Sequence, residues 1–183
     1  DQQDTKAVHE FESVKLLQQI QAFNQGIDPT LGELSDEKTF IFSGAAADPN
    51  CRNQRSLKHR MSKKKEAGAR FVQTQMVMEK DNLIEFCENI SNPLEIPVIA
   101  GVFLLKSYNN ALFINKYVPG ANIPDNILNR LKHAKAPLQE GIEIAAEQAH
   151  DFIDIANGIH LMAVKAEHLI PEILEKADLN LEY

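Results

Sequence analysis

Seven basic side chains lie between residues 52 and 65, and no acidic residue interrupts them. They are Arg52, Arg55, Lys58, Arg60, Lys63, Lys64 and Lys65. Because gathered positive charge offsets the cost of concentrating negative charge, such a segment can bind a phosphate or another polyanion. It can equally be the solvated face of an ordinary surface helix. The sequence alone leaves both interpretations open.

A second candidate for chemistry is the amide of Gln75, which follows Thr74 near the end of the apolar stretch ARFVQTQMV. A buried carboxamide without a hydrogen-bond partner costs about 1–3 kcal/mol. Gln75 must therefore be satisfied either by neighbouring groups or by a ligand. Because the residue beside it is also polar, a strand end that binds a ligand is a reasonable hypothesis.

Hydrophobic periodicity indicates which elements position these side chains. Apolar and β-branched runs predict strands at residues 39–47, 69–77, 97–105 and 159–164. Helical spacing predicts helices at residues 11–23, 54–67, 80–90, 109–115, 124–133, 138–157 and 166–177. We expect Gly68 and Gly158 to cap the helices that precede them. Strands that alternate with helices predict a single α/β domain over residues 1–183, with a parallel sheet.

Polar residues that end or follow the predicted strands should meet at one edge of this sheet. They are Asp48, Gln75, Lys106 and Lys165. In α/β folds, functional groups gather at the carboxyl ends of parallel strands. By contrast, we expect His160, which alternates with apolar neighbours, to be a hydrogen-bonded structural residue. Residues 118–120, Val-Pro-Gly, are expected to serve only as a turn.

Composition argues against several classes of protein. The net charge of −7 disfavours a nucleic-acid partner, and the longest apolar run, residues 96–105, is too short to span a membrane as a helix. No charged start followed by an apolar stretch marks a signal peptide, so we expect a cytoplasmic protein. Cys51 and Cys87 are too few for a disulfide framework and lack metal-ligand spacing, so we expect reduced thiols and no metal site.

Three stretches of the chain carry a resemblance to a known family: KKKEAGARFVQTQ, PVIAGVFLLKSYNNALFINKYVPGANIP and GIHLMAV. In their order and spacing they resemble the methylenetetrahydrofolate reductase family, most closely the branch that some bacteria fuse to a homocysteine methyltransferase. The resemblance covers nearly the whole chain. It implies a parallel β/α barrel of TIM type that carries FAD. The flavin would take a hydride from NAD(P)H and reduce 5,10-methylenetetrahydrofolate to 5-methyltetrahydrofolate, with both substrates using one site in turn.

The same resemblance implies roles for individual residues. The expected folate-binding residues are Gln75, Asn110 and Lys165. The expected FAD-binding residues are Ala47, Asn50, Arg60, Lys63 and Lys64. Gln75 would also contact the nicotinamide, because its amide offers both a donor and an acceptor. Lys165 would meet the glutamate tail of the folate.

One part of the family pattern is missing. The general acid of the family, a Glu at the end of the first barrel strand, has no counterpart, and Asp1 aligns just after the fourth strand. The resemblance therefore covers the last four strand–helix units, a half barrel without a catalytic residue. Exposed sheet edges invite pairing, so we expect a homo-oligomer or a complementary barrel half to complete the site, and no competent reductase from this chain alone. Two alternatives remain open: a non-catalytic half-barrel subunit that binds a partner chain, and a different barrel that binds a sugar phosphate.

Overall fold

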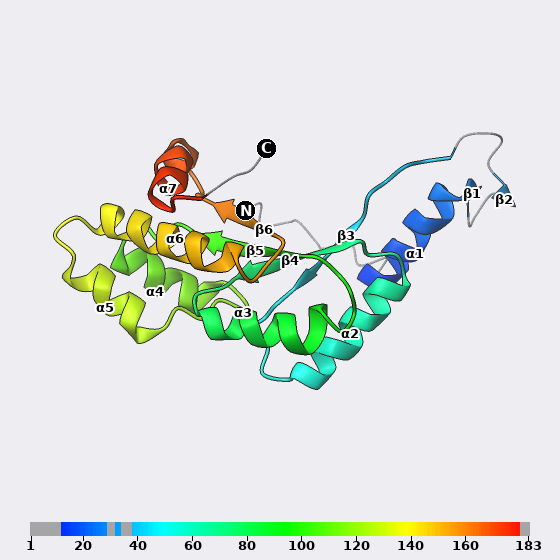
Figure 1. Ribbon diagram of the computed structural model, residues 1–183, viewed down its shortest axis with the longest axis horizontal. Helices are drawn as coiled ribbons and strands as arrows, with labels where there is room; N and C mark the ends of the chain where they lie inside the picture. Colours follow the sequence, from blue (N-terminus) through cyan, green and yellow to red (C-terminus); the bar gives the residue numbers. More distant parts are fainter. Residues whose placement is uncertain (1–11, 29–31, 34–37, 180–183) are drawn as a thin grey trace, which may run out of the picture.

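The centre of the molecule is a parallel sheet. The computed structural model describes residues 12–28, 32–33 and 38–179. Its four-stranded sheet has the order β3–β4–β5–β6, with each strand parallel to its neighbour. The strands are β3 (Gly44–Ala47), β4 (Phe71–Met76), β5 (Val98–Phe103) and β6 (Gly158–Met162). Helices connect successive strands (Figure 1), which confirms the predicted α/β class and the parallel sheet.

Helices lie before, between and after these strands. They are α1 (Ser13–Asn24), α2 (Gln54–Glu66), α3 (Lys80–Phe86), the π-helix η1 (Cys87–Ser91), α4 (Tyr108–Tyr117), α5 (Asp125–His133), α6 (Pro137–Ile153), the 3-10 helix η2 (Glu167–Leu169) and α7 (Ile170–Lys176). All seven predicted helices are found, although Phe11 of the first lies outside the described residues. Within the described part of the chain, no helix is both long and apolar enough to cross a membrane.

The two faces of the sheet differ in burial. Successive side chains of a strand point to opposite faces, so Val72, Val98 and Val102 share one face. All three are buried in one hydrophobic cluster with side chains of α2, α3 and α6. The other face, here called the open face, carries Phe71, Gln73, Gln75, Ile99, Phe103, His160 and Met162, all partly exposed. A parallel sheet in chain order with helices packed on one face has the form of half a TIM barrel.

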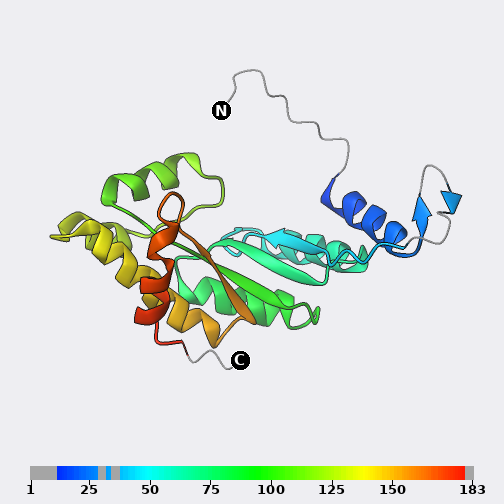
Figure 2. The same cartoon turned by 90° about the horizontal axis from the view of Figure 1, so that it is seen from above.

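The predicted strand at residues 39–47 is wrong in its first half, since only Gly44–Ala47 pairs with β4. Instead, the backbone of Ile41 is hydrogen-bonded to the side chain of Asn24 on α1. This side chain accepts a hydrogen bond from the Ile41 N–H and donates one to the Ile41 carbonyl, both at 2.9 Å. With the short antiparallel pair β1 (Ile27–Asp28) and β2 (Gly32–Glu33), which was not predicted, α1 forms an arm beyond β3 (Figure 2).

The two glycines predicted to cap helices behave differently. Gly68 follows α2 with φ +106°, in the left-handed region, as predicted. Gly158 does not cap α6, because α6 ends at Ile153 and Gly158 is the first residue of β6. Asn157 explains this, since its N–H donates to the Val98 carbonyl and its Oδ1 accepts from the Val98 N–H, each at 2.9 Å. Asn157 thereby begins the pairing with β5 that β6 continues.

Candidate functional site

A cavity of about 720 Å³ opens beside β3 and β4. The small side chains of Gly44–Ala47 form one wall, and α2 contributes a second with Arg60 and Lys64. Phe71 and Gln75 line it from the open face of β4. Four of the predicted binding residues therefore line one cavity, namely Ala47, Arg60, Lys64 and Gln75. The other four, which are Asn50, Lys63, Asn110 and Lys165, do not.

The cations of the cavity come from one side of α2. Arg60 and Lys64 are four residues apart, which places them on the same helix face. Lys64 Nζ donates to the Ala46 carbonyl at 2.7 Å, and Arg60 Nη2 donates to Cys51 Sγ at 3.6 Å. Burial, and then the charge of Arg60, lowers the pKa of Lys64 from its usual value. An anion in the cavity would offset both effects, so this wall is suited to a phosphate.

The amide of Gln75 is held from two sides. Its Nε2 donates to the Pro119 carbonyl at 3.2 Å, and its Oε1 accepts from the Met76 N–H at 3.0 Å. A carboxamide has two N–H donors and two acceptor lone pairs, so one of each remains for a ligand. The strand thus ends on an amide that its neighbours orient and that can still bind.

Residues 118–120 form a turn, as predicted, and this turn also contacts residues at the carboxyl ends of β3 and β4. Gly120 has φ +80°, and a Cβ at this position would lie 2.7 Å from the carboxylate of Asp48. Asn50 Nδ2 donates to the carbonyls of Gly120 at 3.1 Å and Met76 at 3.2 Å. Asn50 therefore ties the turn to the carboxyl ends of β3 and β4 rather than lining the cavity.

Asn110 and Lys165 lie at the carboxyl ends of β5 and β6 but outside the cavity. Asn110 supports the start of α4: its N–H donates to Ser107 Oγ at 3.2 Å, and its Oδ1 accepts from the Lys106 N–H at 3.1 Å. Lys165 is exposed with φ +56°, and its N–H donates to Glu167 Oε1 at 2.9 Å. The three predicted folate residues are thus not brought into one cavity, and the roles of Asn110 and Lys165 stay predictions.

Phe71 and Gln73 are among the cavity residues that the sequence interpretation missed. Both lie on the open face of β4, on either side of the buried Val72, because side chains alternate along a strand. The alternation of residues 71–73 would have revealed them. A register shift follows between Gln73 and Met76. Gln73 Nε2 lies 2.6 Å from His160 Nδ1, so His160 has a hydrogen-bond partner, as predicted.

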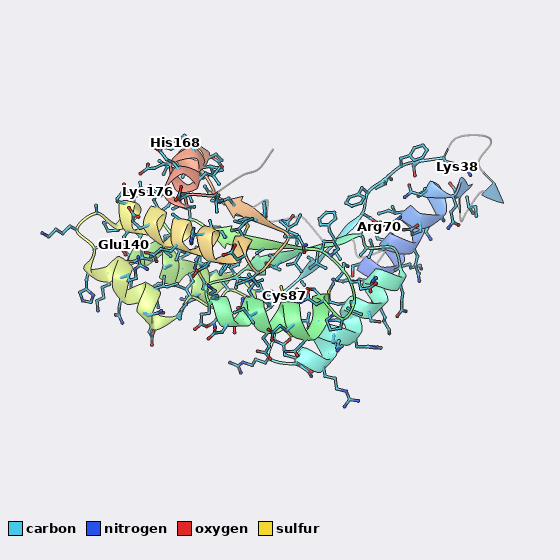
Figure 3. All side chains as sticks on the ribbon, in the orientation of Figure 1. Lys38, Arg70, Cys87, Glu140, His168 and Lys176 are labelled. Atoms are coloured by element: carbon cyan, nitrogen blue, oxygen red, sulfur yellow. The ribbon has the colours of Figure 1, made fainter. Side chains whose placement is uncertain are left out.

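Both cysteines are free thiols. Cys51 is half-buried and accepts a hydrogen bond from Arg60, whereas Cys87 lies buried in the helical layer (Figure 3). Burial raises the pKa of the Cys87 thiol, which keeps it protonated and unreactive at neutral pH. Within residues 12–28, 32–33 and 38–179, no group of three or more His, Cys, Asp or Glu side chains could hold a metal ion.

Comparison with known proteins gives a match to a family model and matches among solved structures. The model of a protein family described as methylenetetrahydrofolate reductase matches residues 40–178. Among solved structures, the chain is similar to an uncharacterized protein from Clostridium thermocellum that binds two copies of 5-methyl-5,6,7,8-tetrahydrofolic acid. The two share 17% sequence identity and a TM-score of 0.56 over 74% of this chain and 52% of the other, which shows a common fold. This chain thus spans about half the length of that protein. No curated protein gives a significant match.

Proposed function

This chain belongs to the methylenetetrahydrofolate reductase family, and we propose that it forms the carboxyl-terminal half of a flavin-dependent reductase. The completed barrel would convert 5,10-methylenetetrahydrofolate to 5-methyltetrahydrofolate with NAD(P)H. The observation that carries this proposal is the single cavity lined by the cations of Arg60 and Lys64 and by the amide of Gln75. The folate bound by the structural neighbour supports the same substrate class.

The residues of the cavity fit FAD in charge and in shape. Arg60 and Lys64 would hold the phosphates, since two neighbouring cations match a dianionic group. The small side chains of β3 leave room for a flat ring, and Phe71 offers an aromatic face. When bound, the flavin would supply the hydride transfer, which no protein side chain can perform.

Gln75 would orient the substrate against that ring. Its remaining N–H and lone pair suit the paired donor and acceptor of a pterin edge or of a nicotinamide carboxamide. Because Pro119 and Met76 already fix the amide, little side-chain entropy is lost when a ligand binds. Folate and nicotinamide would use this amide in turn.

A variant of Gln75 tests the proposal directly. The purified chain is titrated with FAD by flavin absorbance and fluorescence, and then with 5-methyltetrahydrofolate by calorimetry. We expect Gln75→Ala to weaken folate binding about tenfold, or about 1.4 kcal/mol, because two charge-neutral hydrogen bonds are lost. The matched control is Gln139→Ala, which removes an amide on α6 that hydrogen-bonds Glu172 and does not line the cavity.

Three results would contradict the proposal at different points. Equal folate affinity in Gln75→Ala and the unmodified chain would remove Gln75 from its role. A chain that takes up no flavin, either alone or together with a complementary barrel half, would exclude the flavin site. Tighter binding of a small sugar phosphate than of FAD would favour the sugar-phosphate barrel instead.

A second candidate function is a half-barrel subunit whose task is to bind a partner chain. The observation that favours it is the pair of sheet edges, because β3 and β6 each have only one neighbouring strand among the described residues. Either a second copy or a complementary barrel half could pair there. Co-purification of a second chain, with flavin and folate binding lost when the two are separated, would identify this function.

A further inference from the structure

A smaller cavity lies within the helical layer, between the start of α3 and the facing sides of α5 and α6 (Figure 1). It holds about 160 Å³ and shares no lining residue with the cavity beside β3 and β4. Binding sites for drug-sized ligands usually occupy about 300–1,000 Å³. This cavity is therefore too small for a folate or a dinucleotide and suits a smaller molecule.

The side chains that α5 and α6 contribute share one face of each helix. On α6, Ile144, Gln148 and Asp151 are spaced by four and then three residues. On α5, Ile127 and Arg130 are three residues apart. The two isoleucines are buried, whereas Arg130 and Asp151 are partly exposed. The cavity thus has an apolar interior and a charged rim.

The charges of this rim sum to zero, because two cations and two carboxylates line the cavity. Lys80 Nζ lies 3.0 Å from Asp151 Oδ1, and Arg130 Nη2 donates to Glu147 Oε1 at 2.9 Å. Lys80 retains two N–H groups, and Asp151 Oδ2 makes no hydrogen bond to any residue that the structure describes. A ligand with one positive and one negative group would find a partner for each, whereas a single charge would be repelled by one member of each pair.

Gln148 supplies the observation that points to a ligand. It is only 7% exposed, and its Nε2 donates to the Met78 carbonyl at 3.3 Å, which fixes the orientation of the amide. Its Oε1 is buried and makes no hydrogen bond to any residue in the described part of the chain. Buried polar atoms in proteins nearly always have a hydrogen-bond partner. A carbonyl oxygen in this state needs an external donor, and an N–H group of a ligand would supply it.

We propose that this cavity binds a free α-amino acid with an aliphatic side chain. The α-ammonium group would donate to Gln148 Oε1 and pair with Asp151, which lies one helical turn further along α6. The α-carboxylate would accept from Lys80 at the opposite member of the ion pair. The aliphatic side chain would lie against Ile127 and Ile144. This site is independent of the flavin and folate function proposed above.

Methyl nuclear magnetic resonance of the methionines tests the site. The unmodified chain, labelled with ¹³C at the methionine methyl groups, is titrated with leucine, isoleucine, valine and methionine. We expect at least one of them to shift the Met78 resonance at millimolar concentration. Met61 and Met162 line the larger cavity and should not respond. Leucinamide and 4-methylpentanoate, which lack the carboxylate and the ammonium group of leucine, should each bind about tenfold more weakly than leucine.

Two variants test the assigned contacts. Gln148→Met keeps the shape of the side chain and loses the acceptor, and Lys80→Gln loses the cation. We expect each to weaken amino-acid binding about five- to tenfold. The matched control is Lys176→Gln, which removes an exposed ion pair with Glu143 of α6 that does not line the cavity. Urea denaturation checks that Gln148→Met folds, and Lys80, which is exposed, tests the site even where that variant does not.

Each contact can be overturned separately. A Met78 resonance that none of the amino acids moves would overturn the site and leave water as the partner of Gln148. Equal affinity for leucine and 4-methylpentanoate would overturn the ammonium contact. Equal affinity of Lys80→Gln and Lys176→Gln would overturn the carboxylate contact. None of these results bears on flavin or folate binding, because the two cavities have no lining residue in common.

Discussion

Lys63 and Lys64 are adjacent in the sequence, but only Lys64 lines the cavity. Lys64 lines it and donates to the Ala46 carbonyl, whereas Lys63 is exposed and does not line it. We therefore expect Lys64→Gln to weaken FAD binding about five- to tenfold and Lys63→Gln less than twofold at physiological salt, because an exposed charge is largely screened. Fluorescence titration of the flavin measures both.

The pH dependence of the same titration adds a second readout. Because the pKa of Lys64 is lowered, its charge is lost at a lower pH than that of an ordinary lysine. FAD affinity should therefore decline as the pH rises toward 10.5, and this decline should be smaller in Lys64→Gln. Equal losses of affinity in Lys63→Gln and Lys64→Gln would instead mean that the general charge of α2 holds the phosphates.

At the scale of elements, Gly141 controls how closely α6 packs against the chain that leaves β5. Within a helix, Gly→Ala ordinarily adds about 1 kcal/mol of stability. Here a Cβ would lie 1.8 Å from the backbone carbonyl oxygen of Leu105, so the helix would have to move. We expect Gly141→Ala to lower the free energy of unfolding by about 2 kcal/mol or more, measured by urea denaturation. Gly158→Ala is the control, because nothing lies within 4 Å of its Cβ position. A stabilised Gly141→Ala variant would contradict this account of the packing.

The elements that the sequence predicted correctly are those with local causes. The end of α2 follows from Gly68, and β4 follows from the alternation of its own side chains. The errors arise where a side chain from a distant part of the sequence hydrogen-bonds the backbone and so sets the local structure. The side chain of Asn24 hydrogen-bonds the backbone of Ile41, which therefore does not join the predicted strand. The side chain of Asn157 hydrogen-bonds Val98 and begins the strand pairing just before Gly158, where a helix cap was predicted. No periodicity within the affected segments contains that information.

The site shows the same limit at the scale of the whole molecule. Resemblance identified Ala47, Arg60, Lys64 and Gln75, which the fold brings to one cavity. Resemblance did not show that Asn50 ties down the turn at Gly120, because that bond spans 70 residues of sequence. Nor did it show the bridge between Gln73 and His160, which are 87 residues apart and meet only after three strands have paired.

The edge strand of a half barrel has unpaired backbone groups that another chain could bind. At the β3 edge, side chains of the same chain partly block such pairing. Asn24 bonds both backbone groups of Ile41, and Lys64 bonds the carbonyl of Ala46. Next to these bonds, Phe40 and Phe42 are 94% and 73% exposed, an apolar surface that an added strand would cover. The protection at Ile41 therefore decides whether this edge can pair with another chain.

Replacing Asn24 should release that edge. Asn24→Leu frees the N–H and carbonyl of Ile41 beside two exposed phenylalanines, so we expect self-association at lower concentration than in the unmodified chain, measured by sedimentation velocity. Gln18→Leu, on the exposed side of α1, adds similar apolar surface without touching Ile41 and is the control. Equal association of the two variants would show that apolar surface alone drives it. No increase in Asn24→Leu would mean that the edge stays closed without Asn24, and would favour completion of the barrel at β6.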